Sequence, residues 1–171
     1  MEEFEHRIES WFLQYEKAVT NFLIYYMGHR DVEDLVQDTF IRALNSLDQY
    51  KGEASPKTWL LRIARNTAID SLRKKNVLER ILLKLHFSPQ EPAPLIEDLL
   101  IRKESFGKLY QAIHLLPASY REVVLLRGIA DLSSVESAMV LGWSTNKVNV
   151  TFFRAIQKLK KKLGGDVIEE Q

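Results

Sequence analysis

Basic and amide side chains recur at helical spacing between residues 56 and 75. The polar members share one face of the predicted helix, and they are Arg62, Arg65, Asn66 and Arg73. The apolar members share another face, and they are Leu61, Ala64, Ala68 and Leu72. A helix of this kind can pack on a domain through one face and present positive charge to nucleic acid with the other.

A polar loop with glycine and proline leads into this helix and ends at an aromatic side chain. The loop and the helix start supply Lys51, Ser55, Lys57, Thr58 and Trp59. A hydroxyl beside an aromatic ring can capture or stack an unpaired base, and stacking contributes about 1 to 3 kcal/mol per base. A solvated helix with a tryptophan in the core explains this stretch equally well, so both interpretations stay open.

A second pattern typical of DNA binding covers residues 133–163. Ser133 and Glu136 fit a Ser-x-x-Glu capping box, Gly142 follows as a turn residue, and Ser144 can cap the next helix. This is the order of elements in a helix-turn-helix. The polar face of its second helix carries Lys147, Thr151, Arg154, Lys158 and Lys161. An ordinary pair of packed helices is the alternative, and the surplus of positive charge disfavours it.

The early residues of that second helix are the ones that we expect at base edges, and they are Thr145, Lys147, Asn149 and Thr151. Arg154 and the lysines after it, Lys158 among them, are expected at phosphates. Val150 and Phe153 lie three residues apart on a flank of the same helix. They could contact thymine methyl groups or pack against a neighbouring helix, and we favour packing.

Residues 31–48 predict an amphipathic helix with acid on its outer face. Its apolar face consists of Val32, Leu35, Val36, Phe40, Ala43, Leu44 and Leu47. The opposite face consists of Asp34, Gln37, Asp38, Ile41, Arg42 and Asn45. Acid around an exposed isoleucine is a plausible protein-docking surface. Taken alone, the pattern favours a merely solvated face.

No arrangement of residues predicts an enzyme or a metal site. Glu33, Asp34 and Asp38 do not share one helical face, and no second helix carries matching ligands. The four histidines are scattered, and glycine-rich phosphate loops are absent. We therefore expect neither catalysis nor a cofactor.

The charge of the chain is segregated, although its formal net charge is only +1. Residues 1–50 hold four Lys/Arg and ten Asp/Glu, for a net charge of −6. Residues 51–75 reach +5, from seven basic and two acidic residues, and residues 144–162 reach +6, from six basic residues and none acidic. Two basic segments on a neutral chain predict two phosphate-contacting surfaces, with the acidic surface left for another partner.

Composition indicates a helical protein with two modules. Three prolines in residues 88–94 predict a flexible linker between a module over 1–87 and a second over 95–171. We expect helices over residues 4–28, 31–48, 56–75, 77–87, 95–115, 119–128, 133–141 and 144–163. Asp31 is a simple N-cap candidate, and Ser119 with Glu122 fits a second capping box. The chain has no cysteine, no membrane-length apolar run and no signal-peptide pattern, so we expect a cytoplasmic protein.

Together these segments resemble the bacterial sigma factors of the extracytoplasmic-function (ECF) group, of the sigma-70 family. Residues 31–44 are similar to the family's core-polymerase-binding helix, and residues 58–73 to its helix for minus-ten recognition and melting. Residues 116–127, continued by Leu141-Gly142 and Arg154-Ala155, resemble its minus-thirty-five reader. The match covers nearly the whole chain and has three motifs in family order. A free-standing helix-turn-helix regulator is the alternative function.

The resemblance implies an all-α protein without catalytic activity that directs core RNA polymerase to promoters. It implies contact with the polymerase clamp coiled coil through Asp34, Leu35, Gln37, Asp38 and Ile41. It implies minus-ten contacts by Lys51, Ser55, Lys57, Thr58, Trp59, Arg62, Arg65, Asn66 and Arg73. It implies minus-thirty-five contacts by Ser144, Thr145, Lys147, Asn149, Thr151, Arg154 and Lys158. The polymerase flap and an anti-sigma factor are further implied partners, and we expect a monomer with no membrane insertion.

The second module departs from the family pattern in two places. Ser137 stands where the family usually has an apolar residue, and residues 149–153 carry less positive charge than is usual. The promoter sequence therefore cannot be transferred from relatives.

Overall fold

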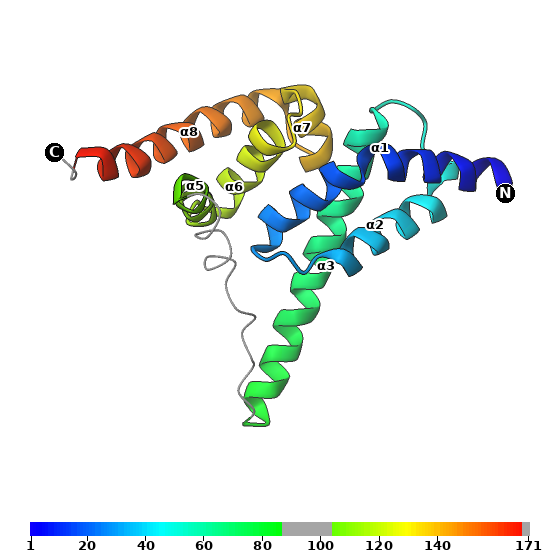
Figure 1. Cartoon of the computed structure of the whole chain (residues 1–171), viewed down its shortest axis with the longest axis horizontal. Helices are drawn as coiled ribbons and strands as arrows, with labels where there is room; N and C mark the ends of the chain where they lie inside the picture. Colours follow the sequence, from blue (N-terminus) through cyan, green and yellow to red (C-terminus); the bar gives the residue numbers. More distant parts are fainter. Residues whose placement is uncertain (87–103, 169–171) are drawn as a thin grey trace. The chain divides into compact units, whose positions relative to one another are not determined.

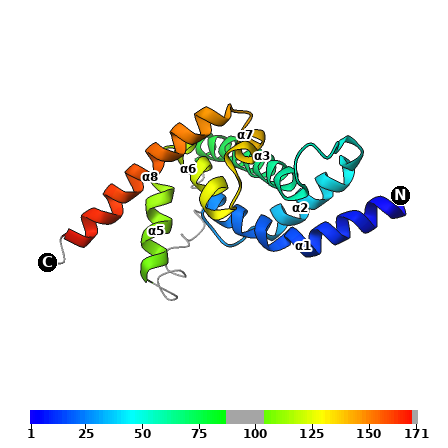
Figure 2. The same ribbon diagram turned by 90° about the horizontal axis from the view of Figure 1, so that it is seen from above.

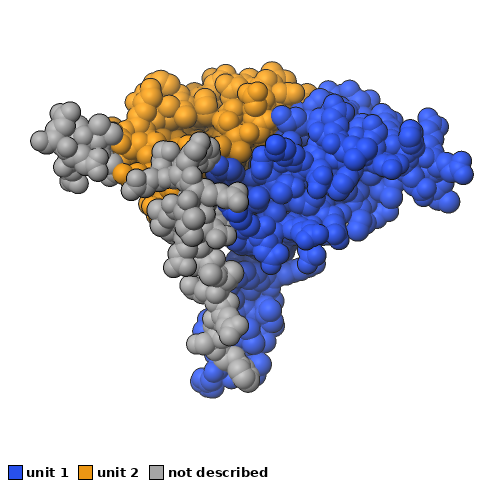
Figure 3. Space-filling view, viewed as in Figure 1, with its two compact units in different colours: residues 1–94 blue, residues 95–171 orange. Residues whose placement is uncertain are grey.

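Helices are the regular secondary structure of the chain throughout residues 1–86 and 104–168, the ranges described by this computed structural model. The chain divides into two compact units, residues 1–94 and 95–171 (Figure 3). The prediction of an all-α fold with two helical modules is confirmed. The predicted linker over 88–94 and the first part of the helix expected from residue 95 lie outside the described residues.

The first unit is built from three long helices and one short turn, and each of the three helices packs on the other two. In chain order these elements are α1 (Glu2–Met27), α2 (Glu33–Asn45), a 3-10 turn (Leu47–Gln49) and α3 (Pro56–Lys84). Figure 1 shows α3 crossing α1 and α2 and then extending well past them. The middle of the unit is therefore where the three helices share a core.

Large aliphatic and aromatic side chains fill that core. Side chains with 0 to 1% exposure come from α1 and α3, and they are Val19, Phe22, Leu23, Leu60 and Leu61. Ala43, Ala64 and Ala68 are also fully buried, and their small size lets the helices approach closely. Burying one large apolar side chain stabilises a fold by about 1.5 to 3 kcal/mol. The predicted packing face of residues 56–75 is thus the face that holds the unit together.

The α3 helix is continuous where the sequence predicted two helices, 56–75 and 77–87. It runs from Pro56 to Lys84 without a break because no glycine or proline interrupts it after its first residue. The last core residue on α3 is Ala68. Beyond that point Val77, Leu78 and Ile81 are about half exposed. The C-terminal part of α3 extends past α1 and α2 (Figure 1).

Two of the predicted helix starts are wrong. The N-cap of α2 is Val32 rather than Asp31, and no side chain caps this helix. The capping box of Ser119 and Glu122 is not the start of its helix, which begins at Ala118 with Pro117 as N-cap. Pro117 fits there because the first backbone N–H groups of a helix have no partner inside it.

The second unit places one long helix against three short ones. Its elements are α5 (Glu104–His114), α6 (Ala118–Val124), a π-helical segment (Leu125–Ile129), α7 (Ser134–Leu141) and α8 (Thr145–Ile168). The α8 helix packs on α5, α6 and α7 (Figure 2). Among residues 145–164 of this helix, Val148, Ala155 and Leu159 are buried, and most of the other side chains are exposed.

The helix-turn-helix of α7 and α8 has the capping that the sequence predicted. The backbone N–H of Glu136 donates to the Ser133 hydroxyl at 3.1 Å, and the Glu136 carboxylate accepts from the Ser133 N–H at 2.7 Å. Gly142 adopts φ 68°, a left-handed conformation that favours glycine, and ends α7. The Lys147 N–H then donates to the Ser144 hydroxyl at 3.2 Å. The predicted helix-turn-helix is confirmed.

An arginine in the π-helical segment contacts both the loop before α7 and the α8 helix. The Arg127 guanidinium donates to the Leu132 carbonyl at 3.1 Å, and its central carbon lies 5.0 Å from the Phe152 ring centroid. A cation over an aromatic face is attracted by the ring quadrupole. Arg127 therefore orients α8 from a segment that the sequence had predicted as plain α-helix.

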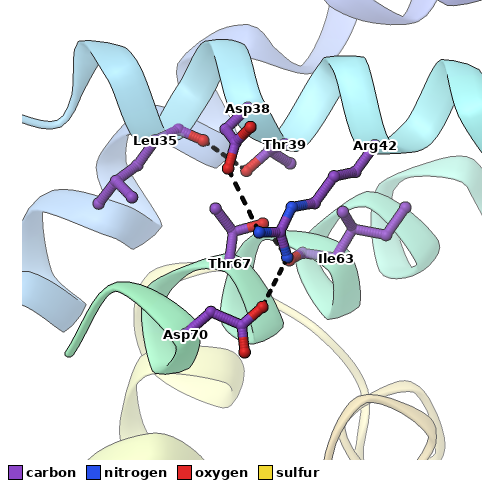
Figure 4. A network of polar contacts seen from close by, with 7 residues as sticks. All are labelled: Leu35, Asp38, Thr39, Arg42, Ile63, Thr67 and Asp70. Atoms are coloured by element: carbon purple, nitrogen blue, oxygen red, sulfur yellow. Dashed lines mark hydrogen bonds and ion pairs between the residues drawn. The ribbon is translucent and has the colours of Figure 1, made fainter. Parts of the chain in front are cut away.

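One polar network joins α2 to α3 (Figure 4). The Arg42 guanidinium of α2 donates to the Asp70 carboxylate of α3 at 2.7 Å, and its other terminal nitrogen lies 3.4 Å from Asp38. The hydrogen bond from Arg42 lowers the pKa of Asp70 below its ordinary value. Inside each helix the Thr39 hydroxyl donates to the Leu35 carbonyl, and the Thr67 hydroxyl to the Ile63 carbonyl.

We expect the Arg42–Asp70 bridge to make the stability of the first unit depend on acid pH. A carboxyl whose pKa is lowered by folding stabilises the fold above its unfolded pKa of about 3.9, and this stabilisation is lost as the pH falls through the folded pKa. Asp70→Asn should therefore flatten the acid side of the stability profile. Urea unfolding followed by circular dichroism at several pH values measures it. The matched control is Asp48→Asn, which removes an exposed carboxylate of the same unit, and equal profiles for the two variants would contradict the prediction.

Candidate nucleic-acid interface

The outer face of α2 gathers acid around one exposed apolar side chain. Asp34 and Gln37 are exposed, and Ile41 is 55% exposed, which is unusual for an isoleucine next to a core. Leu35 and Asp38 are half-buried at the edges of this face. The sequence placed Leu44 in the core, but it is 37% exposed. All five residues predicted to contact the polymerase lie on one helix, and three of them are exposed while the other two are half-buried.

Asp38 differs from its neighbours because it already has a cationic partner in the chain. Its carboxylate lies 3.4 Å from Arg42, one turn along the helix. An exposed pair of this kind contributes little to stability, about 0.3 to 0.5 kcal/mol. The sequence placed Asp38 and Arg42 on the same face, and the structure shows that they form an ion pair, so a cation of a partner must compete with Arg42 for Asp38.

The loop between the 3-10 turn and α3 is fixed at both ends. The Tyr50 hydroxyl donates to the Ala54 carbonyl at 2.6 Å, and Gly52 adopts φ 75°. Ser55 caps α3, since its hydroxyl accepts from the Thr58 N–H at 3.2 Å. Burial raises the pKa of the Tyr50 phenol. Lys51 is exposed at the start of this loop. The loop is therefore short, held by hydrogen bonds, and positively charged at its start.

Thr58 is not placed as the sequence predicted. Its side chain is 1% exposed, and its hydroxyl lies 2.9 Å from the Ser55 hydroxyl. The helix turns Thr58 toward the core, and its hydroxyl therefore contacts the N-cap residue of α3. The expected capture of a base by Thr58 is therefore wrong, because its hydroxyl is buried against the N-cap residue Ser55.

Trp59 belongs to a cluster of aromatic rings. Its centroid lies 5.0 Å from Tyr50 and 6.0 Å from Trp11, and these last two rings meet edge to face at 5.2 Å. The Arg7 guanidinium covers the cluster, 4.9 Å from the Trp11 centroid. Trp59 keeps some exposure, while Trp11 is buried. The ring thus packs against α1 and also borders the loop.

Sequence reasoning missed Arg7, Trp11 and Tyr50. Arg7 and Trp11 are four residues apart, a spacing that places them on one helical face, and this was an available signal. Nothing in the linear sequence joins them to Trp59, because that contact depends on how α1 crosses α3.

The basic face of α3 points away from the core, as the periodicity predicted. Arg62, Asn66 and Arg73 are exposed, whereas Arg65 is half-buried. Lys57 is also half-buried, in the first turn. Three accessible donors at helical spacing lie directly after the ordered loop, so the loop, the Trp59 edge and the cations form one surface of the first unit.

The α8 helix presents most of its predicted DNA-contacting residues to solvent. Exposed members are Ser144, Thr145, Lys147, Asn149, Arg154 and Lys158, and Thr151 is half-buried. Three of them already contact neighbours. The Lys147 ammonium lies 4.1 Å from the Trp143 ring centroid, and Asn149 is hydrogen-bonded to the Ser134 hydroxyl of α7. The Lys158 ammonium lies 5.3 Å from the Tyr120 ring.

Val150 and Phe153 contradict the interpretation that we favoured. They do not pack against a neighbouring helix, since they are 41% and 65% exposed. The reason is helical geometry, because the core of this unit is reached through Val148, Ala155 and Leu159 on the other side of α8.

Neither a metal centre nor a membrane span is found in the ranges that the structure describes. Residues 1–86 and 104–168 hold no group of three or more His, Asp or Glu arranged to bind a metal ion. Among the same residues, no helix combines the length and the apolar character that a membrane crossing requires.

Two family models match the two units separately. The model of Sigma-70 region 2 covers residues 11–77, and the model of Sigma-70, region 4 covers residues 106–159. The first match spans the acidic helix, the loop and the basic face of α3. The alternative of a free-standing helix-turn-helix regulator does not account for it.

Full-length relatives show the same order of parts. The chain is 34% identical to the ECF RNA polymerase sigma factor SigX of Bacillus subtilis over 154 residues, which cover 87% of this chain and 79% of that one. It is also 34% identical to the RNA polymerase sigma factor YlaC of Bacillus subtilis over 171 residues, covering 98% and 99%.

Solved structures agree with these relatives. The sigma factor RpoE of Bartonella quintana, in complex with the anti-sigma factor NepR, superposes with a TM-score of 0.72 at 25% identity and covers 91% of this chain and 96% of that one. CnrH, in complex with the cytosolic domain of CnrY, also reaches 0.72 at 25% identity, covering 95% and 90%. The chain therefore belongs to the ECF group of sigma-70 factors and is an alternative sigma factor that directs RNA polymerase to promoters.

Proposed function

We propose that the two units divide the work of promoter recognition, with residues 1–87 as sigma domain 2, residues 88–94 as linker and residues 95–171 as sigma domain 4. The first unit binds core polymerase and the minus-ten element, and the second binds the minus-thirty-five element. The observation that carries this division is the charge pattern, in which one acidic helix face and two separate basic faces lie on different elements.

The outer face of α2 binds the clamp coiled coil of core polymerase. Ile41 supplies an apolar anchor, with Asp34, Gln37 and Asp38 beside it and Leu35 at its edge. An apolar contact ringed by charge gives both affinity and a fixed orientation. The partner surface must then be basic around an apolar spot.

The loop and the outer face of α3 hold the minus-ten element. Lys51, Ser55 and Lys57 line the approach, and the exposed edge of Trp59 borders it. Arg62, Arg65, Asn66 and Arg73 continue this surface along the helix. An ordered loop beside an aromatic side chain and basic residues suits a single DNA strand whose bases have been unstacked.

The exposed side of α8 enters the major groove at the minus-thirty-five element. Ser144, Thr145, Lys147, Asn149 and Thr151 occupy the first two turns, which contact base edges in helix-turn-helix proteins. Arg154 and Lys158 follow and contact phosphates.

Other properties follow from membership of the family. The chain is not itself an enzyme, because polymerase performs the chemistry, and it acts in the cytoplasm as a monomer until it binds polymerase. It contacts the polymerase flap as well as the clamp. An anti-sigma factor is a further partner, by analogy with the complex of Bartonella quintana RpoE and NepR.

Runoff transcription tests the proposal as a whole. Core polymerase is incubated with a random promoter library, with and without this chain, and the products are sequenced. Promoter-dependent transcripts should require the chain. Their absence with every core polymerase tested would contradict the assignment.

Charge reversal at Asp34 should weaken polymerase binding about tenfold and leave the fold intact. Asp34 is exposed on α2, and the loss of a complementary interface charge reduces both association rate and affinity. Pull-down of core polymerase, with circular dichroism of each variant, measures it. Glu16→Lys, at an exposed acid of α1, makes the same charge change as a control. If the Asp34→Lys and Glu16→Lys proteins bind core polymerase equally well, the outer face of α2 is not the polymerase-binding surface.

Arg62→Ala and Asn66→Ala should impair promoter opening more than duplex binding. Both side chains are exposed and make no contribution to the core, so the fold should change by less than about 0.5 kcal/mol. Permanganate footprinting of the promoter bubble reports opening, and a filter-binding assay reports duplex affinity. Trp59→Phe retains a ring and should open the promoter better than Trp59→Ala. A normal bubble in both the Arg62 and Asn66 variants would count against a melting role for this face.

A further inference from the structure

The apolar pair Val150 and Phe153 forms the outermost part of α8. Counting from the buried Val148 at about 100° per residue, Val150 lies at about 200° and Phe153 at about 140° around the helix axis. These positions are opposite the side that faces the core, and both side chains are exposed, at 41% and 65%. Asn146 and Gln157 are exposed on the same outer side, and the apolar pair lies between them.

The polar residues beside this pair are engaged within the unit. The Lys147 ammonium lies over the Trp143 ring at 4.1 Å, and Asn149 is hydrogen-bonded to Ser134 of α7. Both contacts draw the polar groups toward the flanks of α8. They leave Val150 and Phe153 exposed on the outer side of the N-terminal half of the helix.

The charges around the pair indicate what it contacts. Residues 144–162 hold six basic residues and no acidic one. Arg154, Lys158 and Lys161 are exposed on the same helix. Cations surrounding an apolar spot match the phosphates at the edges of a DNA groove better than they match a second protein.

One base offers an apolar group in the major groove. Thymine carries a C5-methyl group there, and apolar side chains recognise it by contact. Val150 and Phe153 are three residues apart, which is about 4.5 Å along the helix axis. This is close to the 3.4 Å step between successive nucleotides of one strand. The two side chains can therefore reach neighbouring base pairs.

We propose that Val150 and Phe153 read the C5-methyl groups of thymines at neighbouring base pairs of the upstream promoter element. The proposal rests on the assignment of α8 as the helix that binds this element. It names two specificity-determining residues within residues 149–153, a run that carries less positive charge than is usual in the family.

Replacement of thymine by deoxyuridine tests the contact directly, because deoxyuridine lacks only the methyl group. The full-length chain is reconstituted with core polymerase, and its preferred upstream element is first selected from a randomised library. Each thymine of that element is then replaced singly by deoxyuridine, and holoenzyme affinity is measured. Wild type should lose about fourfold at one or two positions, the equivalent of one buried methyl group.

Substitutions in the chain complete the comparison. Phe153→Ala and Val150→Ser should each weaken binding to the thymine element, and at its own position each should abolish the effect of deoxyuridine, since the two changes remove the same contact. Leu115→Ala is the matched control, because Leu115 is 70% exposed in the same unit but lies outside α8. It should behave as wild type at every position.

The outcomes separate this proposal from the function on which it rests. Failure of the holoenzyme to select any upstream element would overturn the assignment of α8 itself. Selection of an element whose thymines can all be replaced without loss would leave that assignment intact and overturn the methyl contact. Variants at Val150 and Phe153 that weaken transcription while the deoxyuridine effects persist would show that the pair binds a protein instead.

Discussion

The packing of α3 against α1 and α2 is the constraint on which the first unit depends. Leu60, Leu61, Ala64 and Ala68 are fully buried, and together they fix how α3 is rotated about its own axis. Once one face of a helix must be buried, the residues about 180° away must face solvent. Arg62 and Asn66 are presented for this reason, so the DNA surface follows from the core. The same packing brings Trp59 against Trp11, which ties the loop before α3 to the first helix.

Ion pairs contribute to this arrangement in a different way from apolar packing. The Arg42–Asp70 bridge joins two helices at 2.7 Å, but both side chains remain partly exposed, and such pairs stabilise a fold only weakly. The bridge is more important for how α2 and α3 are aligned with each other than for the stability of the fold. Because surface charges contribute so little to stability, Asp34 and the exposed arginines of α3 are under few constraints from the fold, and their positions can be set by the partners that they meet.

Features with a local cause could be predicted from the sequence. The Ser133–Glu136 capping box, the left-handed Gly142 and the basic face of α3 each depend on neighbours within one or two helical turns. Features that depend on a distant element could not. The burial of Thr58, the ring cluster around Trp59 and the exposure of Phe153 all depend on which helix crosses nearby. Where the local signal was weak, as at Asp31, the predicted cap was also wrong.

The second unit shows how a few contacts decide which side chains can read DNA. Val148, Ala155 and Leu159 are buried and set the rotation of α8. Arg127 of the π-helical segment contacts α8 through the Phe152 ring. A rotation of one residue, about 100°, would exchange the outward residues for a different set. The specificity of the unit is therefore determined by its core as much as by its surface, and a substitution behind α8 can change promoter choice without touching DNA.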